Sequence, residues 1–183
     1  MSTENENSVL YLQSVDSTNE MAKRLEAYVE TVPLAIVADR QTKGRGSKGR
    51  TWYSASEGGL YFSLLLRPAT FDFALLDLYH TKIGEYLVRL IGELTGISVQ
   101  MEWPNDIILE NKKCGGILIE TAGGSGTPRF VVVGIGLNLN QVRFPKPLRL
   151  IATSLRQKTG IIYDKQSFID ALVKELSYVF ERN

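Results

Sequence analysis

Residues 97–140, ISVQMEWPNDIILENKKCGGILIETAGGSGTPRFVVVGIGLNLN, carry the clearest indication of the fold class. Its apolar and β-branched runs are separated by turn-forming residues and not by a helical pattern. Residues 97–103 indicate a strand, residues 106–120 a hairpin with Asn111 at its turn, and residues 129–140 a further strand entered through a flexible segment at 122–128. Because strands that follow one another without an intervening helix pair most simply as antiparallel neighbours, this stretch favours an antiparallel or mixed sheet.

Helical patterns lie on both sides of these strands. Residues 74–95 repeat leucine and isoleucine at helical spacing, and Gly96 is suited to end that helix. The remaining expected elements are strands at 9–14, 34–39 and 59–68, a helix at 16–30 capped by Ser17 or Thr18, and an amphipathic helix at 168–180. We therefore expect an α+β fold, a mixed β-sheet covered by helices on one face, in a single domain at 9–183 after a disordered tail at 1–8.

Composition narrows the class of protein. The 183 residues are 44% hydrophobic and 22% charged, as in a globular domain, and the net charge of +1 provides no overall field for a nucleic acid or a membrane. Cys114 is the single cysteine, so an internal disulfide is excluded and a reducing cytoplasm is expected. We find no signal-peptide pattern and no apolar run of the roughly twenty residues that span a membrane.

The segment KGRGSKGR, residues 43–50, carries four cations and three glycines. Glycines let the backbone approach a ligand and expose N–H donors, and Arg45 and Arg50 can each grip a phosphate or carboxylate. A solvated basic loop is the alternative. A nucleic-acid site has less support, since Trp52 and Tyr53 are the stacking rings that follow, and the order of a Walker loop is absent.

Two further motifs have structural and functional interpretations. In EWPNDIIL, residues 102–109, Asn105 and Asp106 either form an Asx turn or meet a metal–phosphate group. In KKCGGILIE, residues 112–120, Lys113 either flanks a hairpin or neutralises charge on a transferring group. Cys114 lacks a histidine or acidic partner and is better explained as a buried cysteine than as a nucleophile.

VGIGLNLN, residues 133–140, places Gly134 and Gly136 at alternate positions of an apolar strand. Such a strand either offers a floor for a flat ligand, with the Asn138 amide beside it, or crosses another element closely. His80, the single histidine, falls within the long helix, so a histidine-based triad or metal site is not expected.

The ordered series VDSTN, QTKGRGSKGRTW, WPND, KKCGGILIE, GIGLNLN and ATSL resembles the motifs of bacterial biotin–protein ligases. The resemblance runs from about residue 9 to the C-terminus. It implies a fold shared with the catalytic domains of class II aminoacyl-tRNA synthetases. It also implies a two-step reaction in which biotin and ATP, with Mg²⁺, give biotinyl-5′-adenylate, and a lysine of a carrier domain, such as that of acetyl-CoA carboxylase, then takes the biotin.

The resemblance also implies roles for individual residues. Those at biotin-binding positions are Ser17, Thr18, Asn19, Gln41, Gly44, Arg45, Gly46, Ser47, Trp52, Lys113, Gly116 and Gly136. Those at ATP-binding positions are Arg45, Arg50, Asn105, Asp106, Lys113 and Asn138, with Asp106 as the metal candidate. Arg45 and Lys113 are the expected catalytic residues, because joining a carboxylate to a phosphate requires cations that neutralise both anions.

The sequence departs from the family pattern in three places. Ser47 replaces a second arginine of the loop, and Glu102 stands where lysine is common, which removes two cations near the phosphates. The chain ends after the helix near Arg182, whereas many relatives continue into a small β domain. We also expect no N-terminal DNA-binding domain and hence no repressor role.

Three alternatives remain open. A lipoate ligase or octanoyltransferase would share the fold but carry a different glycine–arginine signature. A non-catalytic biotin sensor would retain binding without chemistry. A nucleic-acid-binding module would depend on the basic loop alone. Relatives often pair through sheet edges, so the resemblance allows a homodimer.

Overall fold

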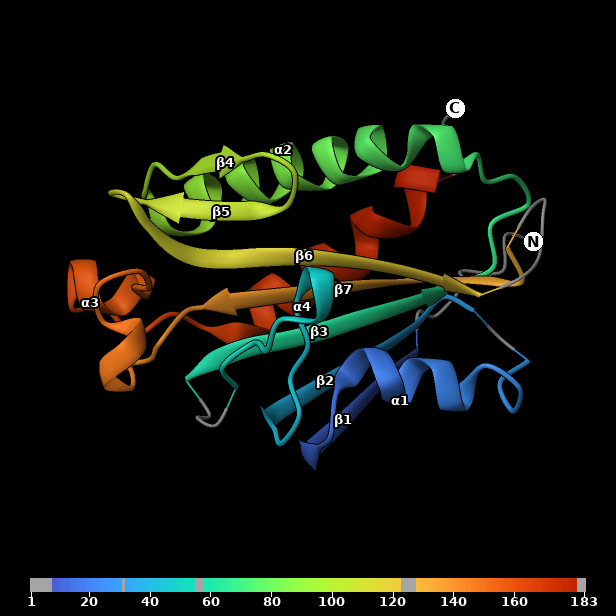
Figure 1. Cartoon of the computed structure of the whole chain (residues 1–183), viewed down its shortest axis with the longest axis horizontal. Helices are drawn as coiled ribbons and strands as arrows, with labels where there is room; N and C mark the ends of the chain where they lie inside the picture. Colours follow the sequence, from blue (N-terminus) through green and yellow to red (C-terminus); the bar gives the residue numbers. More distant parts are fainter. Residues whose placement is uncertain (1–7, 31, 55–57, 123–127, 181–183) are drawn as a thin grey trace.

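The computed structural model describes residues 8–30, 32–54, 58–122 and 128–180. Within them one mixed sheet has the strand order β1-β2-β3-β7-β6-β5-β4 (Figure 1). The strands are β1 Ser8–Val15, β2 Leu34–Gln41, β3 Gly59–Leu66, β4 Gln100–Glu102, β5 Asp106–Leu109, β6 Lys112–Ala122 and β7 Phe130–Asn138. β1 and β2 pair in parallel, and the other neighbours pair antiparallel.

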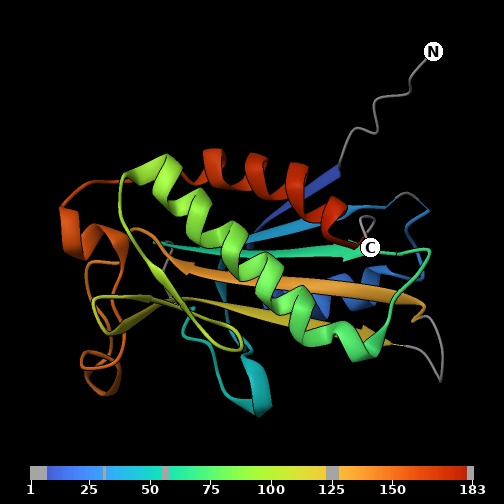
Figure 2. The same cartoon turned by 90° about the horizontal axis from the view of Figure 1, so that it is seen from above.

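Helices lie on both faces of this sheet. The α-helices of the described residues are α1 Thr18–Leu25, α2 Leu76–Thr95, α3 Leu155–Thr159 and α4 Lys165–Leu176. Short 3₁₀ turns occur at Ser47–Gly49, Phe73–Leu75, Lys146–Leu148 and Ser177–Phe180. Figure 2 shows α2 and α4 together in front of the sheet, with α1 behind it.

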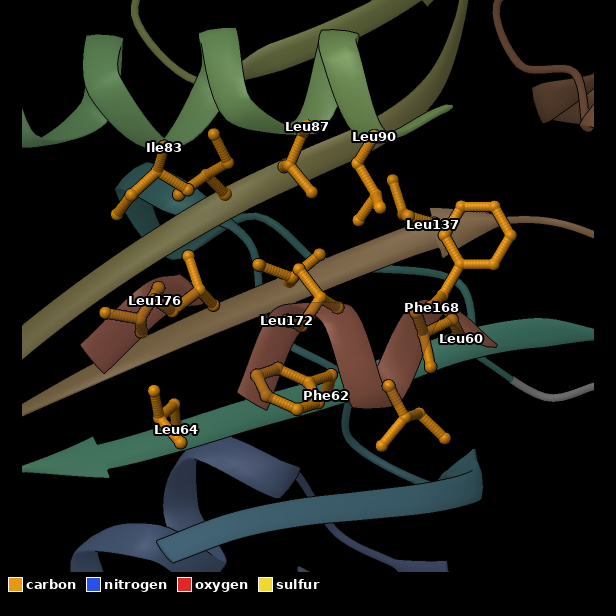
Figure 3. Close-up of a cluster of buried hydrophobic side chains, with 14 of the residues drawn as sticks. Leu60, Phe62, Leu64, Ile83, Leu87, Leu90, Leu137, Phe168, Leu172 and Leu176 are labelled. Carbon is orange, nitrogen blue, oxygen red and sulfur yellow. The ribbon is translucent and has the colours of Figure 1, made fainter. Parts of the chain in front are cut away.

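Strand alternation explains the two faces. Successive side chains of a strand point to opposite sides, so Leu60, Phe62 and Leu64 of β3 face the layer of α2 and α4. There they pack against Leu87 and Leu172, among other leucines of the two helices (Figure 3). Burying each such side chain contributes about 1.5–3 kcal/mol, which makes this layer the main source of stability.

The predicted fold class is confirmed, but the expectation that helices cover only one face is wrong. β2, β3 and β7 carry a second apolar set on the opposite face, including Ile36, Leu65 and Val132, and α1 packs there through Ala22. Strands that are apolar on both sides need cover on both sides.

The predicted ends of elements agree with the structure where a turn residue or a long repeat of apolar residues marks them. Gly96 ends α2 in the left-handed conformation, and Glu110 and Asn111 form the β5–β6 turn with positive φ. α1 ends at Leu25, earlier than expected, and the five-residue α3 is too short to give a periodic signal. Residues 1–7 of the expected tail and residues 123–127 lie outside the described residues, while Ser8 already belongs to β1.

Among the described residues, no helix combines the length and the apolar character needed to cross a membrane.

Candidate functional site

A pocket opens where the N-terminus of α1 meets β6, β7 and the glycine loop, and we call it the first pocket. Its lining comprises Ser17, Thr18, Asn19, Gln41, Arg45, Gly46, Ser47, Trp52, Phe62, Asn105, Lys113, Gly116, Ile117, Leu118, Gly134, Ile135 and Gly136. With the exception of Gly44, every residue assigned to biotin binding by the resemblance is in this set. The fold thus brings together residues as far apart in the sequence as Ser17 and Gly136.

Hydrogen bonds fix the polar end of the first pocket. The backbone N–H of Thr18 donates to Gln41 Oε1 over 2.7 Å, and Gln41 Nε2 donates to Ser54 Oγ over 2.9 Å. Because a backbone N–H can only donate, the orientation of the Gln41 amide is determined. Ser54 Oγ donates in turn to the carbonyl of Trp52, which ties this network to the segment after the glycine loop.

Ser63 belongs to this network and was missed from the sequence. It lies fully buried on β3, and its hydroxyl is 2.7 Å from Thr18 Oγ1 and 2.5 Å from Asn19 Oδ1. A serine within an apolar strand carries no signal of its own, because the contact depends on how α1 crosses the sheet.

Glycines on the neighbouring strands β6 and β7 leave room for the Trp52 ring. A Cβ at Gly136 would lie 2.6 Å from the Trp52 ring, and one at Gly116 would lie 3.3 Å from it. Gly134 similarly faces the Asn19 side chain. The strand is therefore closely crossed, and Gly134 and Gly136 also line the first pocket, while a floor for a flat ligand stays a prediction.

Gly44 has a different position. It is buried and lines neither pocket, and a Cβ there would meet Ser54 Oγ and lie 2.5 Å from the Trp52 carbonyl. Gly44 therefore packs closely against Ser54 and the backbone of Trp52, outside the lining of both pockets.

A second pocket of about 680 Å³ adjoins the first. It is lined by Gly46, Ser47, Arg50, Thr51, Trp52, Tyr53, Glu102, Asp106, Ile108, Asn111, Lys113, Asn138, Phe144, Pro145, Leu148, Leu150, Ile151 and Ala152. This size suits a ligand as large as a nucleotide. Sequence reasoning missed the apolar wall at 144–151, because a loop with scattered apolar residues has no periodic pattern.

Lys113 lies where the two pockets meet, together with Gly46, Ser47 and Trp52. Its Nζ is 2.6 Å from Asp106 Oδ1 and 5.2 Å from the centre of the Trp52 ring. The lysine is thus held between a carboxylate and an aromatic face, at a point that a ligand in either pocket can reach.

The residues assigned to ATP are divided between the pockets. Arg50, Asp106 and Asn138 line the second pocket with Lys113, whereas Arg45 and Asn105 line the first. Asn105 Nδ2 donates to the carbonyl of Ile117 over 2.9 Å. Asn138 Nδ2 donates to the carbonyl of Thr153 over 3.0 Å. Both amides are therefore partly engaged in holding the walls.

Arg45 pairs with two carboxylates, Glu20 and Glu120, and Lys23 joins the same group of charges. Burial opposes ionisation of Glu120, but hydrogen bonds from Lys23 and Asn19 and the charge of Arg45 hold its pKa below the ordinary value. The glycine loop is thereby tied to α1 and β6.

Cys114 and His80 take no part in either pocket. Cys114 is buried, as predicted, and burial raises the pKa of its thiol to about 12, which favours the protonated form at neutral pH. His80 lies on α2, across the sheet, where its Nδ1 is 3.0 Å from the Leu76 carbonyl. Within the described ranges, no group of three or more metal-binding side chains of His, Cys, Asp or Glu occurs.

Comparison with known proteins gives consistent matches. The family model described as Biotin/lipoate A/B protein ligase family matches residues 11–138. The bifunctional ligase/repressor BirA of Bacillus subtilis is 36% identical over 169 residues, which cover 90% of this chain and 51% of that protein. The biotin–[acetyl-CoA-carboxylase] ligase of Paracoccus denitrificans is 31% identical over 166 residues, 88% of this chain and 68% of that protein.

Among solved structures, the biotin protein ligase from Aquifex aeolicus in complex with biotin and ATP superposes with a TM-score of 0.82 at 36% identity. That match covers 96% of this chain and 71% of the other. The chain spans about half the length of the BirA proteins that it matches.

Proposed function

The chain belongs to the biotin/lipoate A/B protein ligase family, and we propose that it is an ATP-dependent biotin–protein ligase. In the first step a carboxylate oxygen of biotin attacks the α-phosphorus of ATP, the bond to the β-phosphate breaks, and pyrophosphate leaves. In the second step the amine of a carrier lysine attacks the carbonyl carbon of biotinyl-5′-adenylate. AMP leaves, and the nitrogen loses a proton to give the amide.

The observation that carries the proposal is the meeting of the two pockets at Lys113. A ligand whose polar ring lies near Thr18 and Gln41 directs its tail past Trp52 toward this lysine. A nucleotide in the second pocket reaches the same point with its phosphates. Holding the two reacting groups at one place supplies much of the rate enhancement of such a reaction without a protein nucleophile.

Cations at that point favour the first step. The carboxylate and the α-phosphate repel each other, and negative charge grows on the phosphate oxygens as the new bond forms. Lys113 lines both pockets and is suited to stabilise this charge, and Arg45 adds a second cation at the loop. The glycine loop over the first pocket would also restrict the access of water to the mixed anhydride.

Mg²⁺ fits the chemistry of the second pocket. Glu102 of β4 and Asp106 of β5 are direct partners across the antiparallel ladder, and both line this pocket. Mg²⁺ in nucleotide sites is commonly held by one or two carboxylates together with substrate phosphates and water. We propose that these two carboxylates hold the ion, which supplies charge neutralisation on the leaving pyrophosphate.

A pyrophosphate-exchange assay tests the proposal. We expect the protein, incubated with biotin, ATP and Mg²⁺, to exchange labelled pyrophosphate into ATP, and to label one lysine of an added biotin carrier domain. Exchange with lipoate or octanoate but not with biotin would show that biotin is not the substrate and would contradict the proposal. Tight biotin binding without exchange would show a sensor in place of an enzyme.

Lys113→Ala is expected to reduce exchange by at least about a hundredfold, in the range found when a preorganised stabilising group is removed. The matched control is the adjacent Lys112→Ala, because Lys112 Nζ donates to the carbonyl of Arg149 and lines neither pocket. Near-normal exchange in Lys113→Ala would remove this lysine from the mechanism.

We also propose that residues 9–183 act as one catalytic domain in the cytoplasm, on the carrier domain of a biotin-dependent carboxylase. The carrier is identified by incubating the protein with candidate carrier domains and locating the labelled lysine by mass spectrometry. Light scattering of the purified protein tests whether two copies pair.

A further inference from the structure

Glu120 lies on β6 at the edge of the first pocket, outside every motif position assigned to biotin or ATP. Because side chains of a strand alternate, Gly116, Leu118 and Glu120 share the face that β6 presents to α1. Gly116 and Leu118 line the first pocket, and Glu120 lies just beyond them. Its side chain is only 16% exposed.

The Glu120 carboxylate joins three parts of the molecule. Its Oε2 accepts a hydrogen bond of 2.8 Å from Asn19 Nδ2, which belongs to the pocket lining. Its Oε1 accepts from Lys23 Nζ over 2.7 Å and from Arg45 Nη2 over 3.1 Å. One carboxylate on β6 thus connects to the start of α1 and to the glycine loop.

This contact fixes the side chain of Asn19. The Oδ1 atom of Asn19 can only accept a hydrogen bond, so the Ser63 hydroxyl, 2.5 Å away, donates to it. The Nδ2 atom can only donate, and it faces Glu120. A flipped amide would place its oxygen against the Glu120 carboxylate, acceptor against acceptor, whereas the Ser63 hydroxyl can donate or accept. The contact with Glu120 therefore determines the preferred orientation of the amide.

Glu20 of α1 provides an internal comparison. It pairs with Arg45 and, over 3.0 Å, with Lys23, as Glu120 does. Within the described ranges the Glu20 carboxylate accepts no hydrogen bond from the Asn19 amide, and the Glu20 side chain is more exposed, at 30%. The two acids and two bases balance in charge, but only Glu120 joins the loop to the pocket lining.

We propose that Glu120 is a positioning residue for biotin binding, which orients the Asn19 amide in the pocket and anchors the glycine loop through Arg45. The proposal rests on the proposed function for the identity of the ligand. The Glu120 carboxylate thus has two separate effects, one on the orientation of the Asn19 amide and one on the position of the glycine loop.

Calorimetric titration with biotin tests the effect on the pocket. Glu120→Gln cannot accept from Asn19, Lys23 and Arg45 together, so we expect its dissociation constant for biotin to rise about tenfold, as for the loss of one charge-assisted hydrogen bond. Glu20→Gln leaves Asn19 in place and should raise the constant by no more than about threefold. Glu93→Gln, which removes an exposed pair with Arg89 on α2, is the control and should bind as the parent protein does.

Limited trypsin digestion tests the effect on the loop without any ligand. Trypsin cuts after Lys48, whose own side chain is outside the charge cluster. We expect both Glu120→Gln and Glu20→Gln to be cut there about fivefold faster than the parent, because each removes a carboxylate partner of Arg45. Glu93→Gln should be cut at the parent rate.

The outcomes separate the inference from the proposed function. If the parent protein does not bind biotin, the proposed function fails, while the digestion still reports on the loop. If the parent binds biotin and Glu120→Gln binds equally well, the inference is overturned. Equal losses of affinity in Glu120→Gln and Glu20→Gln would assign the effect to the loop alone and overturn the role in orienting Asn19.

Should Glu120→Gln not fold, Glu120→Asp keeps the charge with a shorter reach and must show the same two effects to a smaller degree.

Discussion

Gly136 shows at the scale of one residue how packing and function meet in this protein. Glycine weakens a strand, because it adds chain entropy to the unfolded state and packs no side chain. Here its missing side chain leaves the space that the Trp52 ring occupies on the site face of β7. Trp52 in turn lies beside Lys113. The space that Gly136 leaves therefore affects the positions of both residues where the pockets meet.

Gly136→Ala should therefore affect binding more than folding. The added methyl would lie 2.6 Å from the ring, and we expect Trp52 to shift and the dissociation constant for biotin to rise at least about tenfold, as overpacking costs about 1–3 kcal/mol. Calorimetric titration and thermal unfolding measure the two effects. Gly92→Ala on α2 is the control, because a Cβ there meets nothing closer than 3.9 Å. Unchanged affinity in Gly136→Ala would show that Trp52 does not contact the ligand.

At the scale of elements, the loop at 43–50 is held by side chains as well as by its glycines. Ser47 is at its centre and lines both pockets. Its hydroxyl accepts from Arg50 Nη2 over 2.9 Å and from Asn105 Nδ2 over 3.3 Å. The position where the resemblance suggests a second arginine thus carries a small residue that links the loop to Arg50 and to the WPND segment.

We expect Ser47→Arg to slow the dissociation of biotinyl-5′-adenylate. A guanidinium at this position adds a cation beside the phosphate, and a charge-assisted hydrogen bond of about 1.5–3 kcal/mol corresponds to at least about a tenfold slower release. The release rate is measured by chasing labelled adenylate with an excess of unlabelled adenylate. Ser47→Ala, which removes the hydroxyl without adding charge, is the comparison. If both variants release the adenylate at one rate, the missing arginine does not determine retention.

At the scale of the whole molecule, stability and binding are assigned to opposite faces of the sheet. The largest apolar cluster lies between the sheet and the α2–α4 layer (Figures 2 and 3). Most residues that line the two pockets belong to the α1 face of the sheet and to the loops. Substitutions in the core should consequently change the free energy of unfolding without changing the pocket.

Leu172→Ala tests this separation. Leu172 of α4 is fully buried in the core cluster, and its truncation should lower the free energy of unfolding by about 2–5 kcal/mol. Urea unfolding measures this loss, and titration at a temperature where the variant is folded should give a dissociation constant for biotin within about twofold of the parent, as expected for distant sites. A large loss of affinity in the folded variant would show that the two faces are coupled.

Features that depend on neighbouring residues or on a motif could be predicted from the sequence. The leucine period at 74–95 predicted α2, Gly96 and Asn111 marked its end and the β5–β6 turn, and the run of strands predicted a mixed sheet. The motif series pointed to nearly all the residues that line the first pocket. Each of these signals is local, because propensity, capping and spacing act within a few turns of chain.

The residues that support those motifs could be identified only from the tertiary structure. Ser63 and Glu120 reach Asn19 from 44 and 101 positions away, and the placement of α1 on the second face brings them together. The tertiary structure also packs Gly44 against Ser54 and Trp52 and forms the apolar wall at 144–151. Such contacts depend on strand order and register across the whole sheet, and no local pattern of residues specifies these.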